Sequence, residues 1–317
     1  MDHGFDAEQP SLWPDASGQD SALEAVAELI LREDPDGRRF AGAVRRSMDM
    51  LLDGQHTGRF RWEQLYKTEK AHLGTLIEIN LQREFAFADG ARMDYRIAGA
   101  DVDCKFSQTR GAWMIPPEAH GELLLVVWAN DRDSQWCAGL VRALPELLNV
   151  GGNRDAKKTL SAAGRQEVRW LFYNAPLQDN MLLRLSADDV SAVFSHRSGQ
   201  RRVDELFLRA QHRRVSRNVV ATVAMQEDYM KRVRYNGGSR SRLQSRGIVI
   251  LGHYSSHGQL AEQLGLPVPE SGDSVSARLA RLRPHHGGAP CVDLGGEQWT
   301  LALPDDPEEY VPKLPEI

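Results

Sequence analysis

The amino-acid sequence predicts an α/β protein with two domains, in which a mixed sheet flanked by helices precedes a smaller domain of short helices and a basic hairpin. Three observations support this prediction. At 317 residues the chain is long for a single hydrophobic core. Segments with helical and then strand-like apolar spacing fill the first half, and an arginine-rich block follows in the second half. Hydrophobic residues make up 41% and charged residues 26% of the chain, which is typical of a folded globular protein.

Three helices are expected before the first strand. "DSALEAVAELILRE" places apolar residues at helical spacing over residues 20–33. "DPDGRRFAGAVRRSMDMLLDGQ" begins on a turn and continues as a second helix, and "WEQLYKTEKAHLGTLIEINLQREF" predicts a third from about residue 62 to 84.

The pattern then changes to that of a sheet. "MDYRIAG" and "ADVDCKFS" alternate on either side of Gly99 and predict a hairpin. "ELLLVVWAN" is an almost continuous apolar run, as expected of a central strand covered on both faces, and "WCAGLVRAL" predicts its neighbour. The segment "KKTLSAAGRQEVRWLFYN", residues 157–174, is expected to return to helix.

The domain boundaries follow from composition. The acidic start of the chain lacks the basic and apolar regions of a secretory signal, so we expect residues 1–20 to form a loose arm. Residues 21–173 then form the α/β domain, the polar stretch 174–200 a linker, and residues 201–317 the second domain.

The apolar runs and the cysteines exclude other classes. No window approaches the run of about 18 apolar residues that a membrane helix needs, so we expect a cytoplasmic protein. The three cysteines, Cys104, Cys137 and Cys291, form no C-x-x-C pair, which argues against a disulfide framework and a zinc knuckle.

The second domain is expected to begin with three short helices. "RVDELFLRA" places Val203, Leu206, Phe207 and Ala210 on one helical face, and "VSRNVVATVA" and "QEDYMKRVR" follow with almost no linker. The loop "YNGGSRSRLQSRG" then leads into the strand "IVILGHY". Three helices followed by a basic hairpin is the order of a winged helix-turn-helix, and a generic small helical bundle is the alternative.

Charge is concentrated in this second domain. The chain has a net charge of −5, but residues 197–246 contain thirteen basic and four acidic residues, which gives +9 there and −14 elsewhere. Twelve of the thirteen are arginine, the residue suited to bidentate contacts with phosphate and guanine. A site for a polyanion, nucleic acid above all, is the hypothesis, and a solvated helical surface whose arginines have partners elsewhere in the fold is the alternative. The candidate DNA-binding residues, chosen by position in the second and third helices and the loop, are Arg217, Asn218, Lys231, Arg232, Arg234 and Arg240.

The hairpin carries an unusual cluster of charge. Residues two apart in a strand share a face, so Asp103 and Lys105 point the same way and Cys104 points into the apolar layer. If residues 93–97 pair with 102–106, Asp94 lies near the same edge. Two carboxylates held close together need a cation, and Mg²⁺ is the hard ion that oxygen ligands prefer.

This arrangement suits the hydrolysis of a phosphodiester. Asp94, Asp103 and the Cys104 backbone carbonyl can hold the metal, while Lys105 orients or deprotonates the attacking water and offsets charge in the transition state. Glu78 lies in a helix that is apolar on both sides of the carboxylate, and it is a further candidate for catalysis and metal binding. The alternatives are surface salt bridges on the hairpin, and a Glu78 side chain paired with Arg83.

Three stretches resemble the NaeI family of type II restriction endonucleases. They are "LYKTEKAHLGTLIEINLQREFAFADGARMDYRIAGADVDCKFSQTRGAWMIPPE", "NVVATVAMQEDYMKRVR" and "GIVILGHY". The likeness covers roughly residues 30 to 255, and the tail beyond matches poorly except for "LGLPVP" at residues 264–269.

The resemblance implies a PD-(D/E)xK endonuclease core whose catalytic residues are Glu78, Asp94, Asp103 and Lys105, although Met93 and not proline precedes Asp94. It implies a C-terminal winged-helix module related to the catabolite activator protein. It also implies a bacterial homodimer that binds double-stranded DNA at two sites. Cleavage at GCCGGC would then be stimulated by a second copy of that sequence at the C-terminal domain.

Two other functions remain open. A non-catalytic winged-helix regulator would bind DNA without cutting it, and the complete set of Asp94, Asp103 and Lys105 argues against this alternative. A repair or nicking nuclease would cut DNA without discrete double-strand fragments.

Overall fold

The computed structural model describes residues 20–315, so the expected arm at residues 1–20 lies outside it apart from Asp20. The chain forms two compact units. Unit 1 contains residues 20–51 and 66–179, and unit 2 contains residues 52–65 and 180–315. The chain therefore passes between the units three times.

Unit 1 is built on a six-stranded sheet in the order β1-β2-β3-β4-β5-β6. Its strands are β1 (Ala88–Asp89), β2 (Tyr95–Ile97), β3 (Ala100–Ser107), β4 (Leu123–Asn130), β5 (Gln135–Arg142) and β6 (Arg169–Pro176). Neighbouring strands are antiparallel except for β3 and β4, which are parallel. The predicted mixed sheet is confirmed.

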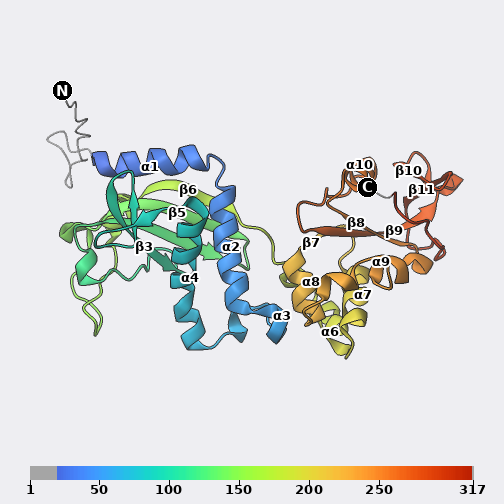
Figure 1. The fold of residues 1–317 in the computed structure, drawn as a ribbon, viewed down its shortest axis with the longest axis horizontal. Helices are drawn as coiled ribbons and strands as arrows, with labels where there is room; N and C mark the ends of the chain where they lie inside the picture. Colours follow the sequence, from blue (N-terminus) through green and yellow to red (C-terminus); the bar gives the residue numbers. More distant parts are fainter. Residues whose placement is uncertain (1–19, 316–317) are drawn as a thin grey trace, which may run out of the picture. The chain divides into compact units, whose positions relative to one another are not determined.

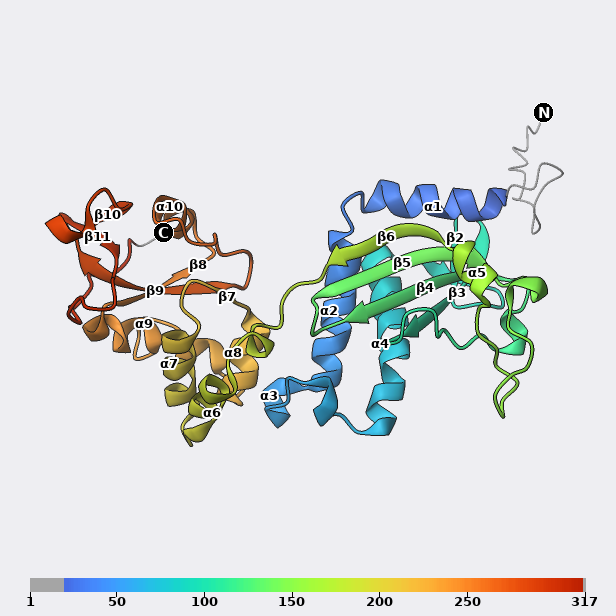
Figure 2. The same ribbon diagram turned by 180° about the vertical axis from the view of Figure 1, so that it is seen from behind.

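Helices cover one face of this sheet. The helices of unit 1 are α1 (Ser21–Glu33), α2 (Arg38–Leu52), α4 (Lys67–Phe85) and α5 (Ala162–Gln166), with 3₁₀ turns η2 (Pro117–Ala119) and η3 (Pro145–Leu147). Figures 1 and 2 show α2 and α4 side by side on the same face, and Phe40 of α2 stacks on Trp136 of β5 at 5.0 Å between ring centroids.

A second apolar cluster covers the opposite face. It includes Trp113 and Ile115 from the segment after β3, Leu148 and Leu160 from the segment after β5, and Val126 of β4. With apolar layers on both sides, β4 is buried along almost its whole length, which confirms the predicted central strand.

The helix expected over residues 157–174 is wrong. Only Ala162–Gln166 is helical, and Arg169–Pro176 forms β6, which pairs antiparallel with β5. The aromatic residues of "RWLFYN" favour a strand, and this strand covers the otherwise open edge of β5, so tertiary pairing outweighs the helical spacing.

Unit 2 begins with helices packed around one core. Its helices are α3 (Gly54–Thr57), α6 (Ala187–Ser195), α7 (Gly199–Arg209), α8 (Arg217–Ala224), α9 (Ser239–Arg242) and α10 (Ser255–Gln263), with 3₁₀ turns η1 (Trp62–Gln64), η4 (Met181–Leu183), η5 (Tyr229–Arg232), η6 (Gln244–Arg246) and η7 (Pro284–His286). Residues 174–200, expected as a linker, thus contain the end of β6, η4 and α6. Met181, Leu182 and Val193 explain this difference because they are buried in the core of unit 2.

The segment 52–65 packs into the same core although it lies 115 residues before Asn180 in the sequence. Phe60 is buried and stacks on Phe194 of α6 at 5.8 Å between centroids. The Asn180 side-chain amide donates a hydrogen bond to the Phe60 carbonyl at 2.9 Å. Nothing in the local sequence pattern of this segment predicts that it belongs to the second unit.

An antiparallel sheet completes unit 2. Its strand order is β10-β11-β9-β7, and β8 also pairs with β9. The strands are β7 (Arg214–Val215), β8 (Ile248–Gly252), β9 (Ser274–Arg281), β10 (Cys291–Leu294) and β11 (Glu297–Leu301). Because α10 lies between β8 and β9, these strands do not form the basic hairpin expected after the helices.

The Arg-rich segment of unit 2 differs from the expected helices and loop. "VSRNVVATVA" forms the predicted helix α8, but "QEDYMKRVR" contains only the 3₁₀ turn η5, and the expected loop contains α9 and η6. A buried carboxylate on α7 holds α9 in place: Asp204 accepts hydrogen bonds from Ser239 and Arg242 of α9, each at 2.7 Å.

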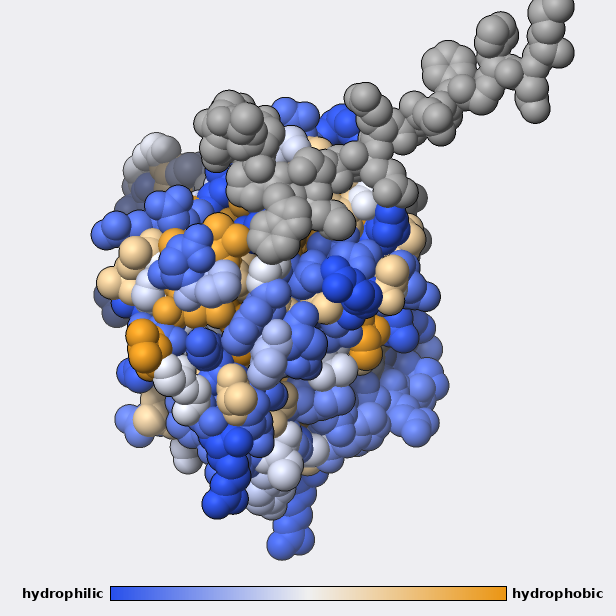
Figure 3. Space-filling model, turned by 90° about the vertical axis from the view of Figure 1, so that its left-hand side faces the viewer, coloured by the Kyte–Doolittle hydropathy of each residue, from blue (hydrophilic) through white to orange (hydrophobic). Residues whose placement is uncertain are grey.

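Within residues 20–315, none of the helices has both the length and the apolar character that a membrane span requires. The side of the molecule shown in Figure 3 is mostly hydrophilic, with small and scattered hydrophobic areas.

A buried arginine joins α2 to the β4–β5 turn of unit 1. Arg45 has a side chain that is 6% exposed, and its guanidinium forms ion pairs with Asp49 at 2.7 Å and with Asp131. Burial by itself lowers the pKa of Arg45, but the two carboxylates more than offset this effect and keep the pKa raised.

We expect Arg45→Ala to lower the free energy of unfolding by about 3–5 kcal/mol, because it leaves two carboxylates without their buried counter-charge. Arg46→Ala is the matched control: its side chain is 51% exposed and pairs with Glu84, so the loss should stay below about 1 kcal/mol. Urea denaturation followed by tryptophan fluorescence measures both. Equal losses for the two variants would contradict the role assigned to Arg45.

Candidate active site

The predicted cluster forms where β3 loses one of its neighbours. β2 pairs with β3 only over Ala100–Val102, whereas β4 follows β3 as far as Ser107. Beyond Val102 the Asp94 side chain takes the place of a strand, since its Oδ2 accepts a hydrogen bond from the Cys104 backbone N–H at 2.7 Å.

The hairpin is tighter than expected. The sequence prediction paired residues 93–97 with 102–106, which would place Tyr95 opposite Cys104, but Tyr95 lies opposite Val102. The difference of two residues arises because Ala98 and Gly99 both have positive φ, of 49° and 82°, and form a two-residue turn. Asp94 directly precedes the pair of Tyr95 with Val102, and its carboxylate still reaches the Cys104 N–H.

Lys105 and Asp103 lie on the same face of β3, as their spacing predicts. The Lys105 Nζ is 2.6 Å from Asp103 Oδ2 and 3.2 Å from the Cys104 carbonyl oxygen, to which it donates a hydrogen bond. The ammonium therefore lies between two of the groups that the sequence predicts as metal ligands, the Asp103 carboxylate and the Cys104 carbonyl. Asp103 is 5% exposed, and within residues 20–315 its buried Oδ2 accepts no hydrogen bond of good geometry.

The carboxyl groups interact electrostatically. Burial raises the pKa of Asp103 to about 6, with Lys105 opposing this shift and Asp94 adding to it. Burial also raises the pKa of Glu78, and the charge of Asp94 raises it further. Three carboxyl groups thus share one ammonium, and a second cation would relieve their repulsion.

Glu78 approaches this cluster from α4. The buried Tyr95 hydroxyl donates a hydrogen bond to the Glu78 backbone carbonyl at 2.8 Å, which fixes this turn of α4 against β2. In the part of the chain that the structure describes, no ion pair joins Glu78 to Arg83. Sequence reasoning overlooked Tyr95, although its place in the alternating "YRI" indicates that it points inward.

The donor atoms present suit a hard divalent cation. Asp94, Asp103 and the Cys104 carbonyl offer oxygen atoms, and Glu78 is close enough to influence them electrostatically. Oxygen-rich sites of this kind favour Mg²⁺ or Mn²⁺ over softer metals. The Cys104 thiol is not part of this set, because it is buried and burial raises its pKa.

The candidate DNA-binding residues of unit 2 fall into three groups. Arg217 and Arg234 are exposed and form no ion pair with a described carboxylate, and the Arg217 guanidinium lies 5.9 Å from the Tyr229 ring centroid. Lys231 pairs with Asp228 at 2.6 Å. The remaining side chains are half-buried: Arg232 donates to Gln226, Arg240 donates to the Ile250 carbonyl, and Asn218 lies in the first turn of α8.

Other arginines of the basic block stabilise the fold. Arg202 donates to the Val223 and Ala224 carbonyls and so caps the end of α8. Ion pairs with carboxylates occupy several more, namely Arg209, Arg214, Arg242 and Arg246. The alternative of intramolecular partners therefore holds for part of the block. Within residues 197–246 of the described chain, the exposed arginines that form no ion pair are Arg197, Arg201, Arg213, Arg217 and Arg234, and Arg213 donates a hydrogen bond to the Arg184 carbonyl.

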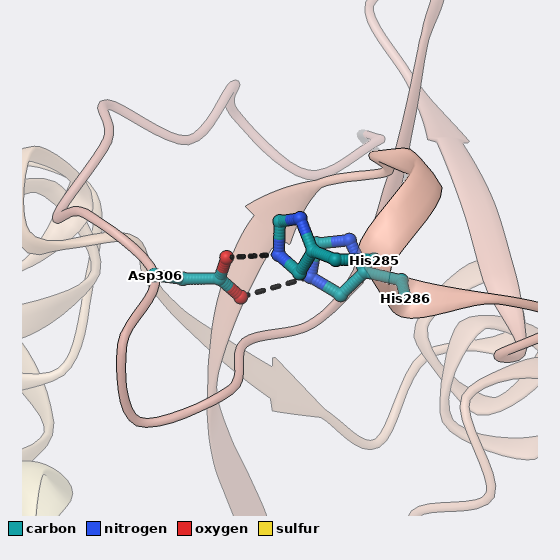
Figure 4. Close-up of side chains that lie close together, drawn as sticks. All are labelled: His285, His286 and Asp306. Carbon is teal, nitrogen blue, oxygen red and sulfur yellow. Dashed lines mark hydrogen bonds and ion pairs between the residues drawn. The ribbon is translucent and has the colours of Figure 1, made fainter.

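A second group of possible metal ligands lies in unit 2, where His285 and His286 face Asp306 (Figure 4). Each Nε2 is 2.8 Å from a different oxygen of this carboxylate. His286 accepts a hydrogen bond from the Arg283 N–H at its Nδ1, so in the neutral ring the proton lies on Nε2 and occupies the position that a metal would need. The Arg283 guanidinium, 3.8 Å from Asp306, also disfavours a cation, so this group reads as a structural contact.

Two comparisons with known proteins agree with each other. The family model described as restriction endonuclease NaeI matches residues 24–309. A type II restriction enzyme NaeI from Lentzea aerocolonigenes is 47% identical over 305 residues, which cover 93% of this chain and 95% of that protein.

The raised pKa of Asp103 predicts how stability depends on pH without metal. The folded protein holds this proton up to pH about 6, whereas the unfolded chain releases it near the ordinary aspartate pKa of 3.8, so the free energy of unfolding should fall as pH rises through this window. Asp103→Asn should lose this contribution while keeping that of other carboxyls with raised pKa, such as Asp273.

Urea denaturation in EDTA at several pH values between about 4 and 7 measures the difference between Asp103→Asn and wild type. If the two proteins show the same pH dependence, Asp103 is not the buried acid described here.

Proposed function

Because this chain belongs to the NaeI family of restriction endonucleases, we propose that it is a type II restriction endonuclease that cleaves both strands of DNA at a specific sequence. The observation that carries the assignment of the site is the position of Lys105, whose ammonium lies between the Asp103 carboxylate and the Cys104 carbonyl. We assign the sheet of unit 1 and its cluster to a PD-(D/E)xK core on this basis.

Each residue of the cluster has a part in hydrolysis. Asp94, Asp103 and the Cys104 carbonyl would hold Mg²⁺, with Glu78 beside them, and the ion would neutralise charge on the phosphate. Lys105 would orient the attacking water and stabilise the negative charge of the transition state. The Asp94 hydrogen bond to Cys104 N–H keeps one carboxylate in place throughout.

Unit 2 serves as the second DNA-binding site in this proposal. The exposed arginines that form no ion pair, such as Arg217 and Arg234, offer positive charge for contact with phosphate. A homodimer would present the same surface to each half of a palindrome, and GCCGGC is the sequence proposed. Unit 2 would act as a winged-helix module, and a second DNA copy bound there would stimulate cleavage in unit 1. The protein would act on DNA in the bacterial cytoplasm.

Incubation of supercoiled plasmid with the protein and Mg²⁺ distinguishes the proposed activity from the two competing functions. Site-specific endonuclease activity gives discrete linear fragments. A winged-helix regulator binds without cutting, and a nicking nuclease gives open circles.

We expect Asp103→Ala and Lys105→Ala each to abolish cleavage and to leave specific DNA binding largely intact, because the contacts with DNA are spread over a wide surface. The chain offers a matched control in Asp155 and Lys157, which repeat the D-x-K spacing in a loop after β5. Asp155→Ala and Lys157→Ala should cleave like wild type. Plasmid digestion with a gel-shift assay measures both properties, and near wild-type cleavage by either Asp103→Ala or Lys105→Ala would remove the assignment.

Arg217→Ala and Arg234→Ala should weaken DNA binding by unit 2 and reduce second-site stimulation. Each lost phosphate contact lowers the slope of log K against log salt by about 0.9. Arg246→Ala is the matched control because Arg246 already pairs with Glu308 at 2.9 Å. Fluorescence anisotropy over a salt series measures the slopes. An unchanged slope for both variants, or an equal change for Arg246→Ala, would contradict the proposed surface.

A further inference from the structure

Asp101 is the one acidic residue of the hairpin without a part in the chemistry above. It lies on β3 opposite Arg96 of β2, and its side chain is 10% exposed. Both carboxylate oxygens are engaged: Oδ1 accepts a hydrogen bond from the Ala91 N–H at 3.1 Å, and Oδ2 accepts one from the Arg92 N–H at 3.0 Å. The Arg96 guanidinium lies 3.6 Å from Oδ1.

The backbone held in this way leads directly to Asp94. Residues 91–94 form an irregular bend between β1 and β2, and no strand pairing fixes them. Asp94 ends this bend and directs its carboxylate to the Cys104 N–H. The bend is therefore anchored to β3 twice, by Asp101 near its start and by Asp94 at its end.

The geometry points to Asp101 as a positioning residue, which holds the bend 91–94 so that the Asp94 carboxylate stays in place to bind the divalent cation. This inference rests on the proposed function of the cluster. The Asp101 oxygens face the Ala91 and Arg92 N–H groups and the Arg96 guanidinium, so its role is to hold the bend and not to bind the cation. It acts through backbone hydrogen bonds that hold Asp94 in position. Residues that hydrogen-bond to metal ligands have the same effect in other metal sites.

Substitutions can separate the backbone contacts from the ion pair. Asp101→Ala removes both acceptors. Asp101→Asn keeps one acceptor, but its NH₂ group faces the second N–H and cannot accept from it. Arg96→Gln is the matched control, because it removes the ion pair and leaves both backbone hydrogen bonds.

Mn²⁺ binding to the full-length protein without DNA, measured by isothermal titration calorimetry, tests the inference. Asp101→Ala should raise the Kd for Mn²⁺ about 10- to 100-fold, Asp101→Asn by less, and Arg96→Gln should bind like wild type. In cleavage assays Asp101→Ala should need correspondingly more Mg²⁺ for half-maximal rate and approach the wild-type rate at saturation. An unchanged Kd for Asp101→Ala, or an equal loss for Arg96→Gln, would overturn the role of Asp101.

Asp103→Ala distinguishes failure of this inference from failure of the site. If Asp103→Ala still binds Mn²⁺ like wild type, the proposed metal site is wrong. If Asp103→Ala loses binding and Asp101→Ala does not, only the positioning role is wrong.

One measurement on the wild-type protein avoids any loss of folding in the variants. The amides of Ala91 and Arg92 should be protected from hydrogen exchange before metal is added, because both donate to Asp101. Unprotected amides at both positions would also overturn the inference.

Discussion

The arrangement of unit 1 depends on one electrostatic constraint, the burial of the Asp103 carboxylate beside Asp94 with Lys105 as the nearest cation. Burial of a carboxylate is costly unless a positive charge or hydrogen-bond donors accompany it. Here the Lys105 ammonium is 2.6 Å away and the pKa of Asp103 is still raised to about 6. The raised pKa means that the charged form of the Asp103 carboxylate is disfavoured in this site. A bound divalent cation would favour the charged form, which is the form that the proposed metal site needs.

The fold provides the edge on which this constraint is built. β2 ends its pairing at Val102, so the Cys104 N–H would lack a partner on that side if Asp94 did not accept its hydrogen bond. The parallel neighbour β4 is buried between two apolar layers and pairs with β3 from Val102 to Ser107 on the other side. A short strand, a long strand and an irregular bend between β1 and β2 thus deliver two carboxylates and one ammonium to the same place.

The sequence predicted the parts of this site that depend on short-range geometry. Asp103 and Lys105 share a face because the side-chain period of a strand is two, and the hairpin at Gly99 brings Asp94 close. The hairpin register was wrong by two residues because pattern alone does not distinguish a two-residue turn from a longer one. The helix predicted over residues 157–174 was wrong for a different reason. β6 forms there because it pairs with β5, and the local sequence does not show which segment pairs with that strand. The packing of Phe60 into unit 2 and the intramolecular partners of arginines such as Arg242 depend on contacts between distant residues, which spacing does not encode.

Anomalous diffraction from crystals of the protein soaked in Mn²⁺ tests the central claim most directly. The account predicts an anomalous peak in contact with Asp94, Asp103 and the Cys104 carbonyl oxygen, with the Lys105 ammonium moved away from that carbonyl. A peak at His285, His286 and Asp306 with none at β3 would contradict it, as would the absence of any peak beside Asp103 while Lys105 keeps its place.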